Sequence, residues 1–98
     1  VLSNPIKGAV NSNCVMTDVW LSMGEKNINK LKLFKGFTVN KDVMKAACKN
    51  AIFMHCLPAK RGKEVSSEVL DSKYSVVLQQ AQNRMYIQQA IMIYVLKK

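Results

Sequence analysis

Histidine, cysteine and arginine are scarce in this 98-residue sequence. There is one histidine, His55, and there are three cysteines, Cys14, Cys48 and Cys56. Three sparse cysteines with no CxxC pair argue against a disulfide framework and favour a reducing compartment. The adjacency of His55 and Cys56 is not a spacing that zinc sites use. The sequence therefore predicts no structural metal, and we expect no cofactor.

Long apolar runs and glycine-rich loops are also missing. The longest apolar run, "AIMIYVL" at 90–96, is far shorter than the roughly 20 residues that a membrane span needs. No signal peptide is visible. Neither GxGxxG nor GxxxxGK occurs, so no phosphate-binding nucleotide motif is present. These absences predict a protein without a membrane partner and without a nucleotide site of those two kinds.

Acidic residues are few, with six Asp and Glu against 15 Lys and Arg, so the net charge is +9. Such a charge raises the possibility of nucleic-acid binding. However, Lys41, Lys45 and Lys49 follow the spacing of one solvated helix face. Aromatic residues do not alternate with basic ones as they do where bases are stacked. We therefore expect no nucleic-acid partner, and a salt-dependent shift of labelled DNA or RNA would be needed to revive that alternative.

What is present is an alternation of apolar runs and amphipathic segments. The patterns predict strands at 13–20, 37–39, 51–56 and 74–78, helices at 25–35, 41–49 and 79–98, and one helical turn within 66–72. The last helix is apolar on several sides, so we expect other parts of the protein to cover it. This order indicates an α/β class, a Rossmann-like three-layer αβα arrangement with a mainly parallel sheet.

Polar side chains follow the predicted strands. Asp18, Ser22 and Met23 come after the first strand, and His55 and Cys56 close the strand at 51–56. In open parallel sheets ligands bind beyond the carboxyl ends of the strands. Asp18 could bind an ammonium group or cap its loop, and His55 could be a general acid or base or a core residue. The sequence predicts a crevice where these strand ends meet.

Cys56 and the residues around it have two interpretations each. A thiol near Arg61 and Arg84 could have a lowered pKa, or it could be buried and inert. Arg84 lies near the start of the last helix, where a positive charge is unfavourable, so we expect it to have an anionic or carbonyl partner. Pro58 could follow a cis peptide bond or an ordinary trans one.

Three segments together resemble ornithine carbamoyltransferases. They are "TDVWLSMGEKN" at 17–27, "FMHCLPAKRGKEV" at 53–65 and "QNRMYIQQAI" at 82–91. The resemblance covers almost the whole chain, and the elements "DVWxSMG" and "HCLP" in combination are specific. It implies that residues 1–98 form the C-terminal part of an ornithine-binding domain, a partial Rossmann-like domain. The implied reaction is carbamoyl transfer from carbamoyl phosphate to the δ-amine of L-ornithine, which yields citrulline and phosphate.

The resemblance also implies how ornithine is bound. Asp18 looks like the carboxylate that grips the ammonium end of ornithine. Ser22 and Met23 look like the loop that closes over its α-amino and carboxylate groups. A loop that reads the amino-acid end disfavours a different amine, such as putrescine, which is one alternative substrate.

For carbamoyl phosphate, the resemblance points to the HCLP segment and to the last helix. Cys56 looks like the proton acceptor at the reacting amine, and Cys56 and Leu57 look like contacts to carbamoyl phosphate. The peptide bond between Leu57 and Pro58 is expected to be cis. Arg84 resembles the arginine that polarises the carbamoyl carbonyl, and His55 would help to order the site.

Other parts of the family's pattern are absent or altered. Gln79 and Gln82 stand where the family commonly has acidic residues, and Lys60 stands where it often has His. The Ser-x-Arg-Thr and His-Pro-x-Gln segments of the carbamoyl phosphate domain do not occur. We therefore expect a fragment of an enzyme, inactive alone; a remnant without activity is the alternative. The family works as a homotrimer in the cytoplasm or in organelles, in arginine biosynthesis or the arginine deiminase pathway.

Overall fold

A short parallel sheet organises the chain. The computed structural model describes residues 1–97. Its elements are α1 (Pro5–Ala9), β1 (Cys14–Thr17), α2 (Ile28–Leu33), α3 (Lys41–Ala46), β2 (Ile52–His55), α4 (Ser67–Leu70) and α5 (Val77–Leu96). β1 pairs with β2 in parallel, from Cys14 opposite Ile52 to Thr17 opposite His55. Both strands therefore end at the same edge, and the residues that follow them emerge side by side.

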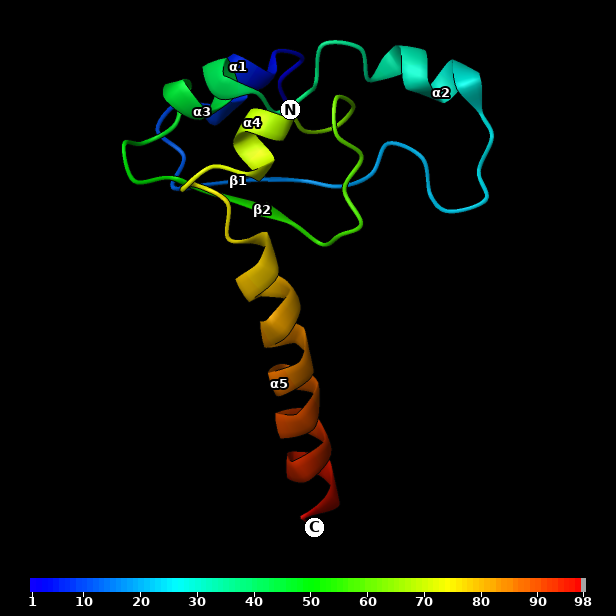
Figure 1. Ribbon diagram of the computed structural model, residues 1–98, viewed down its shortest axis with the longest axis vertical. Coiled ribbons are helices and arrows are strands. Elements are labelled where there is room, and N and C mark those ends of the chain that lie inside the picture. Colours follow the sequence, from blue (N-terminus) through cyan, green and yellow to red (C-terminus); the bar gives the residue numbers. More distant parts are fainter. Residues whose placement is uncertain (98) are drawn as a thin grey trace.

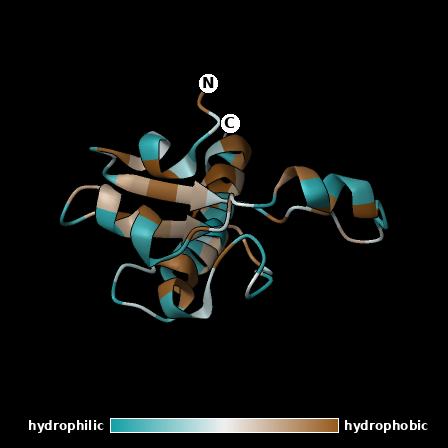
Figure 2. Ribbon diagram, turned by 90° about the horizontal axis from the view of Figure 1, so that it is seen from above, coloured by the Kyte–Doolittle hydropathy of each residue, from teal (hydrophilic) through white to brown (hydrophobic). Residues whose placement is uncertain are grey.

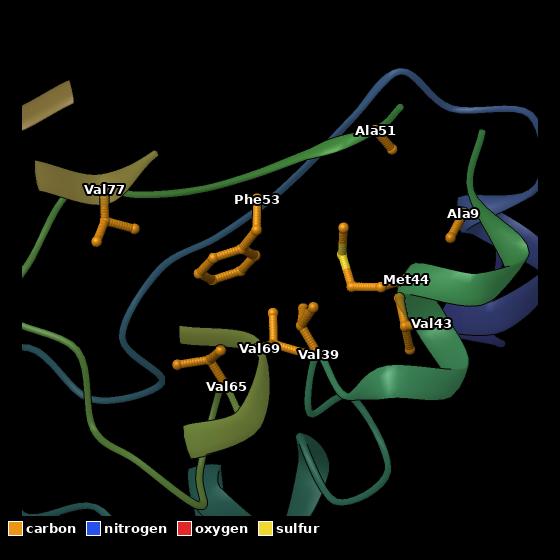
Figure 3. Close-up of a cluster of buried hydrophobic side chains, with 9 residues drawn as sticks. All are labelled: Ala9, Val39, Val43, Met44, Ala51, Phe53, Val65, Val69 and Val77. Atoms are coloured by element: carbon orange, nitrogen blue, oxygen red, sulfur yellow. The ribbon is translucent and has the colours of Figure 1, made fainter. Parts of the chain in front are cut away.

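Helices lie on both sides of this sheet. α1, α3 and α4 cover one side, and α5 starts on the other side and runs away from the body (Figure 1). The arrangement confirms the predicted α/β class with a parallel sheet. The core lies between the sheet and the layer of α1, α3 and α4. The ring of Phe53 from β2 points toward Val39, Val65 and Val69 (Figure 3). Burial of such side chains is the main favourable term in folding.

The strands are shorter and fewer than the sequence predicts. The predicted strand at 74–78 is wrong, because only Ser75 forms a bridge, with Phe53, and α5 begins at Val77. The predicted strand at 37–39 is likewise reduced to one bridge, between Val39 and Val65. The strand at 13–20 ends at Thr17. Apolar runs favour burial, but only pairing along the whole run makes a strand, and at 37–39 and 74–78 the pairing lasts for one residue.

Capping residues set the starts of the short helices. Asn27 and Asn40 accept hydrogen bonds from the free backbone N–H groups of α2 and α3. Both helices are shorter than the predicted 25–35 and 41–49. α1 was not predicted, although Asn4 caps it and Pro5 opens it, which are ordinary start signals. The predicted helical turn within 66–72 and the long last helix are confirmed.

The cap of α3 supports a prediction about stability. Asn40→Ala removes the acceptor for the N–H groups of Asp42 and Val43, so we expect the free energy of unfolding to fall by about 1 kcal/mol. Urea denaturation followed by circular dichroism measures this change. Asn29→Ala is the matched control, since Asn29 lies exposed within α2 and alanine is a better helix former. Equal losses in both variants would contradict the capping argument.

Two parts of the chain stand apart from the core. Residues 18–38, which include α2, form an arm that extends away from the sheet in both views (Figures 1 and 2). Within this arm the rings of Trp20 and Phe34 stack with centroids 5.8 Å apart. The last turns of α5 are exposed, so the cover expected for them is not provided by residues 1–97. Among the described helices, none combines the length and apolar character required to cross a bilayer.

Candidate active site

Asp18 and Cys56 meet at the carboxyl edge of the sheet. Each follows directly on the last pair of the ladder, Thr17 opposite His55. The Cys56 thiol donates a hydrogen bond to Asp18 Oδ1 over 3.1 Å. The same oxygen accepts the N–H of Val19 at 2.7 Å, which turns the chain and ends β1. Parallel register thus brings together two polar residues that lie 38 positions apart in sequence.

The Asp18 carboxylate affects the pKa of the Cys56 thiol. The hydrogen bond to Asp18 raises the pKa of Cys56, and partial burial raises it further, while the positive charge of Arg84 has a weaker lowering effect. The pKa of Asp18 is lowered, chiefly by the same hydrogen bond from Cys56. Of the two interpretations of Cys56, a lowered thiol pKa is therefore not the one that the structure favours. Arg61 does not offset the carboxylate, because its guanidinium pairs with Asp71 at 2.5 and 2.8 Å.

Alkylation kinetics test this electrostatic control. In a background with Cys14→Ala and Cys48→Ala, Asp18→Asn removes the negative charge beside Cys56, so the pKa of the thiol should fall. Since the thiolate is the reactive form, iodoacetamide should modify Cys56 severalfold faster at neutral pH, with the rate profile displaced to lower pH. Asp42→Asn, on the exposed surface of α3, should leave the profile unchanged. An unchanged profile in Asp18→Asn would contradict the argument.

The HCLP segment makes a tight turn immediately after β2. Leu57 has a positive φ of 58°, and the peptide bond between Leu57 and Pro58 is cis, which confirms the isomer predicted from the resemblance. The Leu57 N–H donates to Nδ1 of the buried His55 at 2.8 Å. His55 Nε2 lies 3.2 Å from Oε1 of Glu64, which is buried as well. His55 is thus a buried residue that orders the turn.

Helix α5 contributes to this edge from the other side of the sheet. Gln80 Oε1 accepts the backbone N–H of His55 at 3.0 Å and so ties the helix to β2. Arg84 lies one turn further along on the exposed surface, near enough for its charge to affect Cys56. Asp18 after β1, Cys56 after β2 and Arg84 in α5 therefore lie at the same edge of the sheet.

Among the described residues, Ser22 and Met23 take no part in the hydrogen bonds of this group. They lie on the arm, and the side chain of Met23 is 93% exposed. The arm is held by its own contacts, since the Glu25 carboxylate accepts the N–H of Ser22 at 3.2 Å and pairs with Lys30 at 3.1 Å. Within residues 1–97, no hydrogen bond links Ser22 or Met23 to Asp18 or Cys56. The loop is therefore ordered by contacts within the arm, but it does not cover Asp18 and Cys56.

An open hollow of about 530 Å³ lies beside β1 and reaches the site from one side. Its wall includes Asp18, Trp20 and Phe34, and most of its surface is apolar. Cys56 is not part of that wall. The hollow follows the outer edge of β1, so it borders the Asp18 end of the site without containing the thiol.

Two residues at the site escaped the sequence analysis. Glu64 and Gln80 hold His55 from two directions, yet the sequence patterns point to neither. The only available signal for Glu64 was a single carboxylate within the basic stretch 60–64, directly before the apolar Val65. Gln80 gave no signal, since it lies among similar polar residues at the start of a helix.

Comparisons with known proteins point to one family. The family model "Aspartate/ornithine carbamoyltransferase, Asp/Orn binding domain" matches residues 1–95. The ornithine carbamoyltransferase of Prochlorococcus marinus strain MIT 9312 is 48% identical over 94 residues, which are 94% of this chain and 30% of that protein. The chloroplastic ornithine carbamoyltransferase of Pisum sativum is 47% identical over 97 residues, 97% of this chain and 26% of its own length.

Solved structures give the same result. The anabolic ornithine carbamoyltransferase of Campylobacter jejuni superposes with a TM-score of 0.88 at 38% identity, over 97% of this chain and 32% of that one. The enzyme of Pyrococcus furiosus gives 0.85 at 45% identity, over 93% and 30% of the two chains. The chain thus spans about a third or less of the length of these relatives.

Proposed function

The chain belongs to the aspartate/ornithine carbamoyltransferase family, and from that premise we propose that it supplies the ornithine side of a carbamoyl transfer. The reaction takes carbamoyl phosphate and L-ornithine to L-citrulline and phosphate. The observation that carries the proposal is the hydrogen bond between Asp18 and Cys56, because it joins the two motif segments at one point. A carboxylate and a thiol at one point suit an ammonium substrate that must lose a proton.

Asp18 is proposed to bind the δ-ammonium group of ornithine. Both hydrogen bonds that the Asp18 carboxylate accepts use Oδ1, which leaves Oδ2 for a cation. The arm would then close and bring Ser22 and Met23 over the α-amino and carboxylate groups. Such a closure excludes water and strengthens the electrostatic contacts inside the site.

The proposed chemistry begins with a proton. An alkylammonium group has a pKa of about 10.4, so the amine must be deprotonated before its nitrogen can attack. Cys56 is the proposed acceptor, and it must first release its own proton to water. A cation on Asp18 would neutralise the charge that raises the pKa of Cys56, so ornithine binding itself would favour the thiolate.

The transfer then proceeds through a tetrahedral intermediate. The neutral δ-nitrogen forms a bond to the carbamoyl carbon, and the bond from that carbon to the phosphate oxygen breaks. Phosphate leaves with the electron pair and takes up the second proton that the nitrogen must lose. Arg84 is proposed to stabilise the charge that develops on the carbamoyl oxygen. Cys56 and Leu57, with Pro58 in the cis turn, would contact carbamoyl phosphate. Because carbamoyl phosphate is an activated mixed anhydride, much of the rate can come from positioning.

A citrulline assay tests the proposal. The complete protein that carries this chain should form citrulline from ornithine and carbamoyl phosphate, and it should lose that activity in Cys56→Ala. Putrescine should be a poor acceptor, because it lacks the groups that Ser22 and Met23 would hold. Turnover of putrescine in preference to ornithine would replace the proposed substrate, and absence of any carbamoyl transfer would support a remnant without activity.

The remaining proposals concern the larger protein. We propose that residues 1–98 are the C-terminal part of the ornithine-binding domain, that the carbamoyl phosphate domain is a separate part of the enzyme, and that this chain alone forms no citrulline. The complete enzyme would be a homotrimer in the cytoplasm or in an organelle matrix. It would serve arginine biosynthesis or the arginine deiminase pathway. Sedimentation of the purified enzyme tests the homotrimer, and a citrulline assay on the isolated chain tests its inactivity.

A further inference from the structure

Glu64 has a position that the proposed chemistry does not explain. Its side chain and that of His55 are both 0% exposed, in a chain where almost all other charged groups face water. Burial of a carboxylate is costly unless its oxygens accept hydrogen bonds. Oε1 accepts the N–H of Lys60 at 2.6 Å and lies 3.2 Å from His55 Nε2, whereas Oε2 is buried without a partner. All the contacts of this carboxylate converge on one oxygen.

Hydrogen bonding determines which ring nitrogen of His55 carries the proton. The Leu57 N–H points at Nδ1 over 2.8 Å, and a nitrogen that accepts this bond has no hydrogen of its own. The proton therefore resides on Nε2, which donates it to Glu64 Oε1. Donors and acceptors alternate without conflict from the Leu57 amide to the carboxylate. We name this series of contacts the Glu64–His55–Leu57 relay.

The relay ends on a residue with an unfavourable backbone. Leu57 has a φ of 58°, in the left-handed region that a branched side chain seldom adopts. Such conformations persist only where the surroundings enforce them. The bond from the Leu57 amide to His55 is a direct restraint on that φ. It also orients the peptide groups on either side of Leu57, which are those that the proposed function assigns to carbamoyl phosphate.

We propose that Glu64 is a positioning residue: it keeps His55 in the Nε2–H tautomer, so that Nδ1 holds Leu57 in its left-handed conformation and aims the Cys56 and Leu57 backbone at carbamoyl phosphate. The aiming step rests on the proposed function, whereas the tautomer does not. The main chain of Glu64 is held separately, because its carbonyl oxygen accepts the N–H of Val39 at 2.9 Å. The side chain can therefore be changed while that backbone contact remains.

Three variants separate positioning from a structural contribution. Glu64→Gln keeps an acceptor oxygen for His55 and Lys60, and it should preserve the relay. Glu64→Ala removes the acceptor and should release the tautomer. Val65→Ala is the matched control, because Val65 is the adjacent residue and equally buried, but its side chain belongs to the apolar core.

Nitrogen-15 NMR of the imidazole group reads the tautomer without any activity. In the complete protein labelled at histidine, the signals of His55 are identified by their loss in His55→Gln. We expect the Nε2–H form in the parent protein, in Glu64→Gln and in Val65→Ala, and a mixture of tautomers in Glu64→Ala. An Nδ1–H or doubly protonated ring in the parent or in Glu64→Gln would overturn the proposal even if Glu64→Ala does not fold. An unchanged tautomer in folded Glu64→Ala would do so too.

Kinetics then test the aiming step. Since a misplacement of about 1 Å can cost about 100-fold in rate, Glu64→Ala should lose about 100-fold in kcat with a nearly unchanged KM for ornithine. Glu64→Gln should recover most of this loss, and Val65→Ala should keep the parent kcat below its melting temperature. Equal losses of kcat in Glu64→Ala and Val65→Ala would overturn the positioning role. A parent protein that forms no citrulline would refute the proposed function, while the NMR result would still decide the relay.

Discussion

Asp18→Asn should lower kcat/KM for ornithine by about 100-fold or more in the complete protein, with little change in the KM for carbamoyl phosphate. Removal of one partner from a closed charge pair costs roughly 2–5 kcal/mol, and about 1.4 kcal/mol corresponds to a factor of ten. Asparagine keeps the size of the side chain and an acceptor for the Val19 N–H, so the turn after β1 should survive. Steady-state kinetics with each substrate varied in turn measure the effect.

Asp42→Asn is the control for this substitution. Asp42 is an exposed carboxylate in the first turn of α3, and its nearest basic partner, Lys45, lies 3.9 Å away. Loss of one surface charge there should leave kcat/KM for ornithine within about twofold of the parent, since exposed ion pairs contribute at most about 1 kcal/mol. If Asp18→Asn retained full kcat/KM, the proposed grip on the ammonium group would be refuted.

Phe53→Ala should produce the largest loss of stability. Phe53 is the largest apolar side chain that is completely buried, and it shares the core cluster with residues from α3, α4 and the segments before these two helices. Replacement of a buried phenylalanine by alanine costs about 3–5 kcal/mol, because a cavity remains where the ring lay. That cost is a large fraction of the roughly 5–15 kcal/mol that stabilises an ordinary domain. Urea denaturation followed by circular dichroism measures the difference.

Ile52→Ala is the control from the same strand. Ile52 precedes Phe53 in β2, points to the opposite face of the sheet and is 38% exposed. We expect it to lose less than about half of the free energy that Phe53→Ala loses, since less apolar surface leaves water there. Similar losses for the two variants would show that the core does not centre on Phe53.

Several parts of the fold were predictable because their signals are local. The strand at 51–56, the helical turn near Ser67 and the long last helix follow from hydropathy and capping over a few neighbouring residues. The strand predicted at 74–78 was wrong, because the apolar run "YSVVL" fits a strand and the start of a buried helix equally well. Only the tertiary structure distinguishes a strand from a helix here. Ser75 forms a single bridge with Phe53, and the chain then turns at Val76 into α5.

The candidate site likewise has features that the sequence predicts and features that it does not. The sequence alone shows that polar residues follow β1 and β2, and the motif resemblance predicts the cis peptide bond between Leu57 and Pro58. The arm around Ser22 and Met23 was expected as a loop, but its open position could not be read from spacing. Loop position depends on contacts with distant segments, and hydropathy patterns carry no information about those.

The sequence alone determined the class of fold, the family and the residue types available at the strand ends, since each follows from composition and order along the chain. The tertiary structure alone decided that Asp18 raises the pKa of Cys56 and that Arg61 pairs with Asp71 instead. It also decided that Glu64 is buried against His55. Electrostatic and hydrogen-bond effects depend on distances of a few ångströms, and for residues far apart in sequence only the packing of the folded chain sets those distances.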